Sequence, residues 1–164
     1  MRPFFRILSA ITITLAAGSA AAAEYRAGDI TIADPWSRAT APAARTGAGF
    51  MTIGNGGSAD DRLIAAATEA AGRVELHRSV MQDGVMRMIE QEDGIPVPAG
   101  ETVILEPGGL HLMMMGLTGP LAKDSRVPVI LTFERAGTVV VELAVGAAGS
   151  AMAPMGHGAA GHGN

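Results

Sequence analysis

Short apolar or alternating stretches, separated by Gly, Pro, Asp and Asn, fill residues 24–145. Side chains alternate between the two faces of a strand, so this pattern predicts short strands. We expect strands at residues 30–32, 47–53, 73–82, 85–91, 102–106, 110–115, 127–134 and 138–145. Residues 60–71 are rich in alanine, and there we expect one or two turns of helix. Evenly spaced short strands predict an all-β sandwich or small barrel.

The first 23 residues have the features of a removable secretion signal. Arg2 and Arg6 precede a largely apolar run, and three small residues end at Ala23. We therefore expect cleavage after Ala23 and export to the periplasm. The apolar run is short for a segment that spans a membrane, which argues against a retained anchor. The chain contains no cysteine, so we expect neither lipid attachment nor disulfides, and no thiolate for a blue-copper site.

Charge excludes two classes of partner. The net charge is −4, and removal of Arg2 and Arg6 makes it more negative. Such a chain has no electrostatic basis for binding nucleic acid or an anionic membrane surface. The folded domain is expected to span residues 24–145 as a monomer, without stable membrane insertion.

Residues 146–164 have a different composition. They contain Gly, Ala, Ser, Met, His and Pro, with no charged side chain and few bulky apolar ones. Such a segment buries too little surface to offset its ordering entropy, which predicts a disordered tail.

All four histidines have methionines nearby, and two of them form the pattern His77-x10-Met88-x22-His111-x-Met113. Thioethers favour Cu(I), and imidazole accepts copper in either oxidation state. Zinc is a weaker fit, because it rarely accepts a thioether. The alternative is that the methionines fill the core and the histidines bind nothing.

Local geometry supports a shared site. Asp83-Gly84 predicts a two-residue hairpin turn. The resulting register places His77 and Met88 diagonally on one face, at about 7–8 Å between backbones. On the later strand, His111 and Met113 share a side. The hairpin face is expected to show six residues: His77, Ser79, Met81, Met86, Met88 and Glu90.

Glu90 is expected directly opposite His77, where it would orient the imidazole by accepting a hydrogen bond. The two His/Met pairs together supply two nitrogens and two sulfurs without negative charge, a set that suits Cu(I).

These motifs resemble the periplasmic copper chaperone family PCu(A)C. The resemblance covers residues 36–145 and rests on four stretches. They are Trp36-Ser37-Arg38-Ala39, the Gly-Ala-Gly-Phe strand that ends at Phe50, the His77 to Met88 hairpin, and Pro107-Gly108-Gly109-x-His111-x-Met113.

The resemblance implies a cupredoxin-like β-barrel that holds one Cu(I) and delivers it to cytochrome oxidase assembly. The implied ligands are His77, Met88, His111 and Met113. Some members have methionine directly after the first histidine, where this chain has Arg78. Counting the family motif from that residue places its middle methionine on Ile89, which cannot ligate. Met88 is therefore the best choice and Met86 the fallback.

The tail is a second candidate site. Its possible ligands are Met152, Met155, His157 and His162. Imidazoles on a mobile chain can capture Cu(II) and pass copper inward as Cu(I). The alternative is a solvated linker whose histidines bind nothing.

The sequence therefore predicts a copper chaperone that is not an enzyme. Its partner would be a copper-receiving or copper-donating periplasmic protein, either an oxidase subunit or an assembly factor. The alternative is a periplasmic buffering or resistance protein that sequesters copper without a dedicated recipient. A copper redox enzyme is disfavoured, because such sites usually contain three or more histidines and the domain has two.

Overall fold

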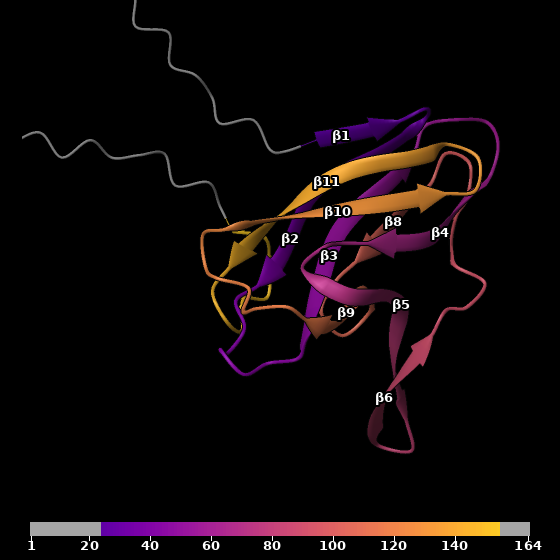
Figure 1. Ribbon diagram of the computed structural model, residues 1–164. Helices are drawn as coiled ribbons and strands as arrows, with labels where there is room; N and C mark the ends of the chain where they lie inside the picture. The colour runs from indigo at the N-terminus through magenta and orange to yellow at the C-terminus, as the bar shows by residue number, and fades with distance from the viewer. Residues whose placement is uncertain (1–23, 155–164) are drawn as a thin grey trace, which may run out of the picture.

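The computed structural model describes residues 24–154, which form one mixed sheet of eleven strands (Figure 1). The strands are β1 (Glu24–Ala27), β2 (Ile30–Arg38), β3 (Thr46–Asn55), β4 (Asp61–Ala67), β5 (Ala71–Gln82), β6 (Val85–Glu90), β7 (Ile95–Val97), β8 (Thr102–Leu105), β9 (Leu110–Leu117), β10 (Arg126–Phe133) and β11 (Gly137–Gly146). The predicted all-β class is confirmed. Within this part of the chain, no helix is long and apolar enough to cross a membrane.

The sheet follows the order β6-β5-β9-β8-β3-β2-β11-β10-β4-β7, with β1 beside β2 and an additional pairing of β9 with β3. Most neighbours are antiparallel, whereas β2–β11 and β8–β9 are parallel. β4 and β5 lie near opposite ends of this order and still contact each other. The sheet therefore curls back on itself around its interior.

The interior holds one apolar core. Along β10 the side chains alternate between exposed and buried, and Val129 and Leu131 have no exposed surface. Buried side chains from β2 to β5 and β7 to β11 join the same cluster. Each fully buried large aliphatic side chain stabilises the fold by about 1.5–3 kcal/mol. The chain has no cysteine, so this apolar core stabilises the fold without the disulfides that many exported proteins contain.

The helix expected within residues 60–71 is wrong, because this segment forms β4. β4 pairs with β10 on one side and β7 on the other, and it buries Leu63 and Ala66. Alanine prefers a helix by only a few tenths of a kcal/mol per residue over most side chains. Two ladders of hydrogen bonds and a buried face outweigh that preference.

Three strand assignments were incomplete. β1 and β7 were not predicted, and β2 continues beyond residue 32 to Arg38. Asp34-Pro35 has the composition of a turn, but here it forms an irregularity at which the β2–β3 register shifts, with Asp34 at φ 48°. β7 has three residues with Pro96 at its centre, and it lies at the end of the sheet order, where a missing N–H is tolerated.

Gly146 is the last residue of β11, and the chain then turns at residues 147–150. The Nε of Arg38 donates a hydrogen bond of 2.6 Å to the carbonyl oxygen of Ser150. The guanidinium also lies 5.5 Å from the ring centroid of Phe50. The predicted signal (residues 1–23) and residues 155–164 of the predicted tail lie outside the described residues.

Candidate metal centre

The candidate site lies on three neighbouring strands, β6, β5 and β9. His77 is on β5, between the other two. It is paired with Glu90 of β6 on one side and with His111 of β9 on the other. Directly paired residues point to the same face of a sheet. The two histidines therefore share a face, and their ring centroids are 5.9 Å apart.

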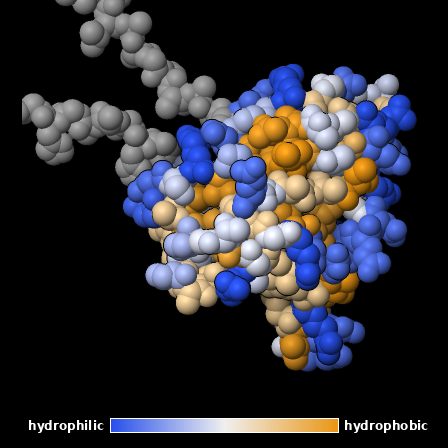
Figure 2. Space-filling view, viewed as in Figure 1, coloured by the Kyte–Doolittle hydropathy of each residue, from blue (hydrophilic) through white to orange (hydrophobic). Residues whose placement is uncertain are grey.

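The hairpin of β5 and β6 has the predicted turn and register. Asp83 and Gly84 both have positive φ, 52° and 77°, which a type I′ turn requires. Met81 is paired with Met86, and Ser79 with Met88. Figures 1 and 2 show that this hairpin projects from the body of the molecule. Met88 is 55% exposed and lies diagonally from His77.

β9 also has the expected alternation. Leu112 and Met114 have no exposed surface and belong to the core. Met113 lies on the opposite face, paired with Glu75 of β5 and Ala48 of β3. His111 shares that face with Met113 and is only 4% exposed. The register thus brings two histidines and two methionines, from distant parts of the chain, onto one face of adjacent strands.

The His77 ring has one nitrogen engaged and one without a partner. Its Nε2 donates a hydrogen bond of 2.9 Å to Oε2 of Glu75. Among the described residues, no hydrogen-bond partner exists for its Nδ1, which is buried. A buried polar atom without a partner costs about 1–3 kcal/mol. A metal ion bound at Nδ1 would satisfy this atom, so the site fits a metal.

The His111 ring is hydrogen-bonded to the backbone of Gly109, the residue just before β9. Its Nδ1 donates to the carbonyl oxygen of Gly109 at 3.0 Å. Burial lowers the pKa of His111; the hydrogen bond to Gly109 opposes this, and a charge on His77 would lower the pKa further. A lowered pKa keeps the imidazole neutral, which is the form that binds metals.

Glu75 is a neighbour of His77 that the His/Met spacing did not indicate. Its Oε1 accepts a hydrogen bond of 2.5 Å from Nε of Arg73, while Oε2 faces His77. The hydrogen bond from His77 and the charge of Arg73 hold the pKa of Glu75 below its usual value. Glu75 lies two residues before His77 on the same strand, and this spacing could have identified it.

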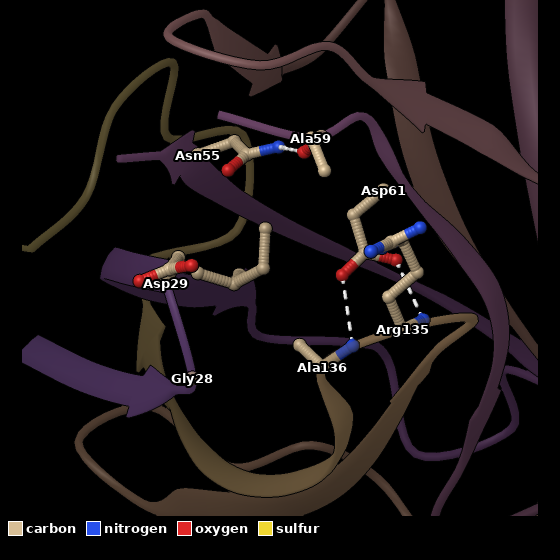
Figure 3. Close-up of a pocket in the computed structure, with 8 residues that line it drawn as sticks. Gly28, Asp29, Asn55, Ala59, Asp61, Arg135 and Ala136 are labelled. Atoms are coloured by element: carbon tan, nitrogen blue, oxygen red, sulfur yellow. Dashed lines mark hydrogen bonds between the residues drawn. The ribbon is translucent and has the colours of Figure 1, made fainter. Parts of the chain in front are cut away.

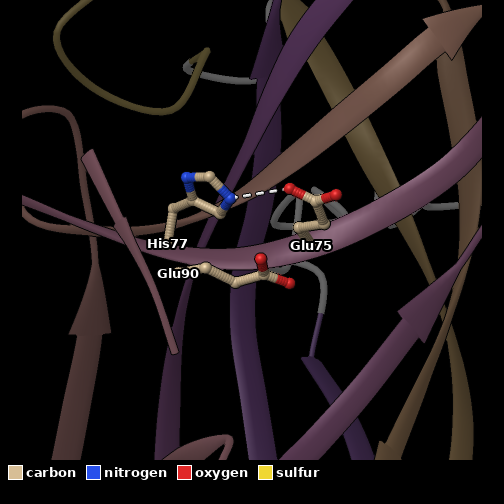
Figure 4. Close-up of side chains that lie close together, drawn as sticks. All are labelled: Glu75, His77 and Glu90. Carbon is tan, nitrogen blue, oxygen red and sulfur yellow. Dashed lines mark hydrogen bonds and ion pairs between the residues drawn. The ribbon is translucent and has the colours of Figure 1, made fainter. Parts of the chain in front are cut away.

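Glu90 was expected to accept the hydrogen bond of His77. This expectation is wrong, because the acceptor is Glu75. Glu90 does lie opposite His77. Potential ligand atoms of Glu75, His77 and Glu90 all fall within 4.8 Å of one another. Figure 4 shows, however, that the hydrogen bond runs to Glu75. Two carboxylates therefore flank one edge of the His77 ring.

The candidate tail site is described only in part. Met152 is 66% exposed. Met155, His157 and His162 lie outside the described residues. The tail site therefore stays a prediction.

A cavity of about 240 Å³ lies between the β1–β2 turn, the end of β3 and the β10–β11 turn (Figure 3). The Asp61 carboxylate accepts three backbone hydrogen bonds there, from Arg62, Arg135 and Ala136. These contacts occupy both oxygens of Asp61 and tie β4 to the β10–β11 turn. Asp61 therefore has a structural role, which is to hold the β10–β11 turn against β4.

Comparison with known proteins finds relatives of this chain. A family model described as "Putative lipoprotein LpqE-like" matches residues 30–145. A second match is a protein of Leifsonia xyli subsp. xyli (strain CTCB07) that is also described as a putative lipoprotein. It is 37% identical over 111 residues, which are 66% of this chain and 67% of that protein.

Two solved structures extend the comparison to copper. The copper-bound PCuAC domain from PmoF2 is 27% identical, with a TM-score of 0.65 over 76% of this chain and 98% of that domain. The solution structure of CuI-DR1885 from Deinococcus radiodurans is 29% identical, with a TM-score of 0.53 over 68% of this chain and 74% of that one. The resemblance to the PCu(A)C family is thereby confirmed, and the chain belongs to the LpqE-like family of PCuAC-type proteins.

Proposed function

We propose that this protein binds one Cu(I) ion in a site of two histidines and two methionines and delivers it to another protein. The proposed ligands are His77, Met88, His111 and Met113. The observation that carries the proposal is the buried Nδ1 of His77, which has no partner among the described residues and belongs to a ring 5.9 Å from that of His111.

The chemistry of the donors favours Cu(I) over other ions. Two neutral imidazoles and two thioethers add no negative charge, and soft sulfur donors prefer Cu(I) to divalent metals. The presence of copper in the related PmoF2 domain and in CuI-DR1885 supports the same cargo here. The chain carries copper as cargo and performs no catalysis of its own in this proposal.

The position of Met88 favours transfer over storage. Met88 is 55% exposed. Its neighbours on the same hairpin face, Met81 and Met86, are 66% and 52% exposed. Exposed methionines adapt to varied partner surfaces. A partner can therefore approach Met88 and replace it as a ligand, while His77 and His111 still hold the ion. This exposed methionine surface of the hairpin is the proposed docking site.

The recipient and location follow the family resemblance. We assign delivery to a periplasmic protein of cytochrome oxidase assembly, and we assign the curled sheet to the cupredoxin-like class. The predicted signal (residues 1–23) supports export, as does the description of the family as lipoproteins. The tail residues Met152, Met155, His157 and His162 are proposed to form a second, separate site that binds Cu(II).

An anaerobic Cu(I) competition titration against a chromophoric chelator tests the site. Three proteins would be compared: the mature chain, a tail variant with Met155, His157 and His162 replaced by Ser, and the double variant Met88→Leu/Met113→Leu. We expect one tight equivalent that survives in the tail variant and is lost in the double variant. The opposite pattern would overturn the ligand assignment.

A transfer experiment separates a chaperone from a buffer. The copper-loaded protein would be mixed with a copper-free soluble oxidase domain, either directly or across a dialysis membrane. A chaperone transfers copper much faster in direct contact, because the ion passes through a complex that shares ligands. Equal rates in both arrangements would favour the buffering protein.

A further inference from the structure

Glu75 is held on both sides. One carboxylate oxygen accepts from Arg73 at 2.5 Å and the other faces Nε2 of His77 at 2.9 Å. Arg73 is itself tied to β9, because its guanidinium donates to the sulfur of Met115 at 3.5 Å. A chain of contacts thus runs from Met115 through Arg73 and Glu75 to His77. This chain restricts the rotation of the carboxylate.

The contact with Glu75 determines which nitrogen of His77 carries the proton. A carboxylate accepts hydrogen bonds and does not donate them, so Nε2 must be the protonated nitrogen of a neutral ring. The lone pair is then on Nδ1. Figure 4 shows Nδ1 on the ring edge turned away from Glu75 and Glu90. Nδ1 is also the buried atom that has no partner among the described residues.

The opposite holds at His111. Its Nδ1 lies 3.0 Å from the carbonyl oxygen of Gly109, which can only accept. Nδ1 of His111 is therefore the protonated nitrogen, and its lone pair is on Nε2. The two histidines, although directly paired across β5 and β9, present different nitrogens.

We propose that Glu75 is a positioning residue that holds His77 in its Nε2-protonated form, so that Cu(I) is bound by Nδ1 of His77 and by Nε2 of His111. This inference rests on the proposed function. A carboxylate behind a metal-binding imidazole fixes the ring orientation and raises the basicity of the ligating nitrogen. Glu75 acts through His77 and does not contact the ion.

The test uses the mature protein labelled with ¹⁵N-histidine. Long-range ¹H–¹⁵N correlation spectra of the imidazole rings identify the protonated nitrogen in the copper-free protein and the nitrogen that Cu(I) shifts. We expect Nε2–H at His77 and Nδ1–H at His111 before copper is added. Cu(I) should then shift Nδ1 of His77 and Nε2 of His111.

Matched variants separate the hydrogen bond from the charge. Glu75→Leu removes the acceptor, Glu75→Gln keeps a neutral one, and Glu90→Leu removes the neighbouring carboxylate that is not bonded to His77. We expect Glu75→Leu to mix the tautomers of His77 and lower Cu(I) affinity by about 10- to 100-fold. Glu75→Gln should recover part of that loss, and Glu90→Leu should match the wild type. Backbone amide spectra check that each variant is folded.

Two results would overturn the inference: a copper-induced shift at Nε2 of His77, or an equal loss of affinity in Glu90→Leu and Glu75→Leu. If Cu(I) shifts neither histidine, the proposed function itself fails. The copper-free spectra then still decide whether Glu75 fixes the tautomer, because that measurement needs no metal.

Discussion

His77 and His111 lie directly opposite each other in the antiparallel pairing of β5 with β9, with ring centroids 5.9 Å apart. The backbone hydrogen bonds of the two strands, rather than a loop, set this separation. In the proposed site, therefore, copper binding would not have to bring the two histidines together. Such preorganisation lowers the entropic cost of binding.

Single substitutions distinguish the proposed methionine ligands from their neighbours. Met88→Leu and Met113→Leu should each lower Cu(I) affinity by more than about tenfold, or about 1.4 kcal/mol, because each removes a thioether. Met81→Leu and Met86→Leu are controls of the same chemistry on the same hairpin face. Chelator competition measures all four. A loss in Met86→Leu with none in Met88→Leu would show that Met86 is the ligand.

The core prediction concerns Leu112, between His111 and Met113 on β9. Leu112 has no exposed surface, so Leu112→Ala should lower the free energy of unfolding by about 2–5 kcal/mol. Ile104→Ala is the control, because Ile104 is 55% exposed and its truncation should change stability by less than about 0.5 kcal/mol. Urea denaturation of the copper-free proteins provides the comparison. Equal effects would contradict the assigned core.

Asp61 should make stability depend on acid pH. Burial raises the pKa of Asp61, but backbone hydrogen bonds from Arg135, Arg62 and Ala136 outweigh it and leave the pKa lower than 3.8. The folded state thus binds fewer protons than the unfolded state. The stabilisation is complete above pH 3.8 and is lost as the pH falls through the lower folded value.

The variant Asp61→Asn tests this directly. It should lower the free energy of unfolding at pH 7 by about 1.5–3 kcal/mol, the usual contribution of hydrogen bonds to a charged group. The difference from the wild type should shrink at acid pH, where the wild-type carboxyl is protonated too. Asp93→Asn, at an exposed turn, is the control and should show neither effect. A pH-independent difference would contradict the prediction.

The copper-free protein should show His111 titrating below the value of 6.5 that is usual for histidine. Burial is the main cause of this lowered pKa. Between the folded and unfolded pKa values the unfolded state binds more protons, so the contribution of His111 destabilises the protein as the pH falls below 6.5. Imidazole proton shifts followed by NMR measure the pKa, and the urea-unfolded protein is the reference. A folded value at or above 6.5 would contradict it.

The parts of the site that are local in sequence were predictable. Asp83-Gly84 determines the turn, and a two-residue turn determines every pair along β5 and β6, including Ser79 with Met88. The alternation in β9 separates Met113 from the buried Leu112 in the same way. Both predictions depend on the period of a strand and on one turn, and both are confirmed.

The remaining features depend on contacts that no local pattern specifies. The pairing of β5 with β9 joins distant segments, so the direct opposition of His77 and His111 could not be read from spacing. β4 became a strand because β7 and β10 flank it. Glu75 is different: its position two residues before His77 was visible, but its role depended on the rotamer that Arg73 stabilises.

β6 is exposed along its whole length and ends the sheet, with β5 as its only neighbouring strand among residues 24–154. Detaching β6 from β5 breaks one ladder of hydrogen bonds, and no residue of β6 belongs to the apolar core. In the proposed site, Met88 is the one ligand on this strand. Copper release is then a local unfolding event of a single hairpin. Its rate depends on the stability of that hairpin, and the domain as a whole can stay folded throughout the exchange.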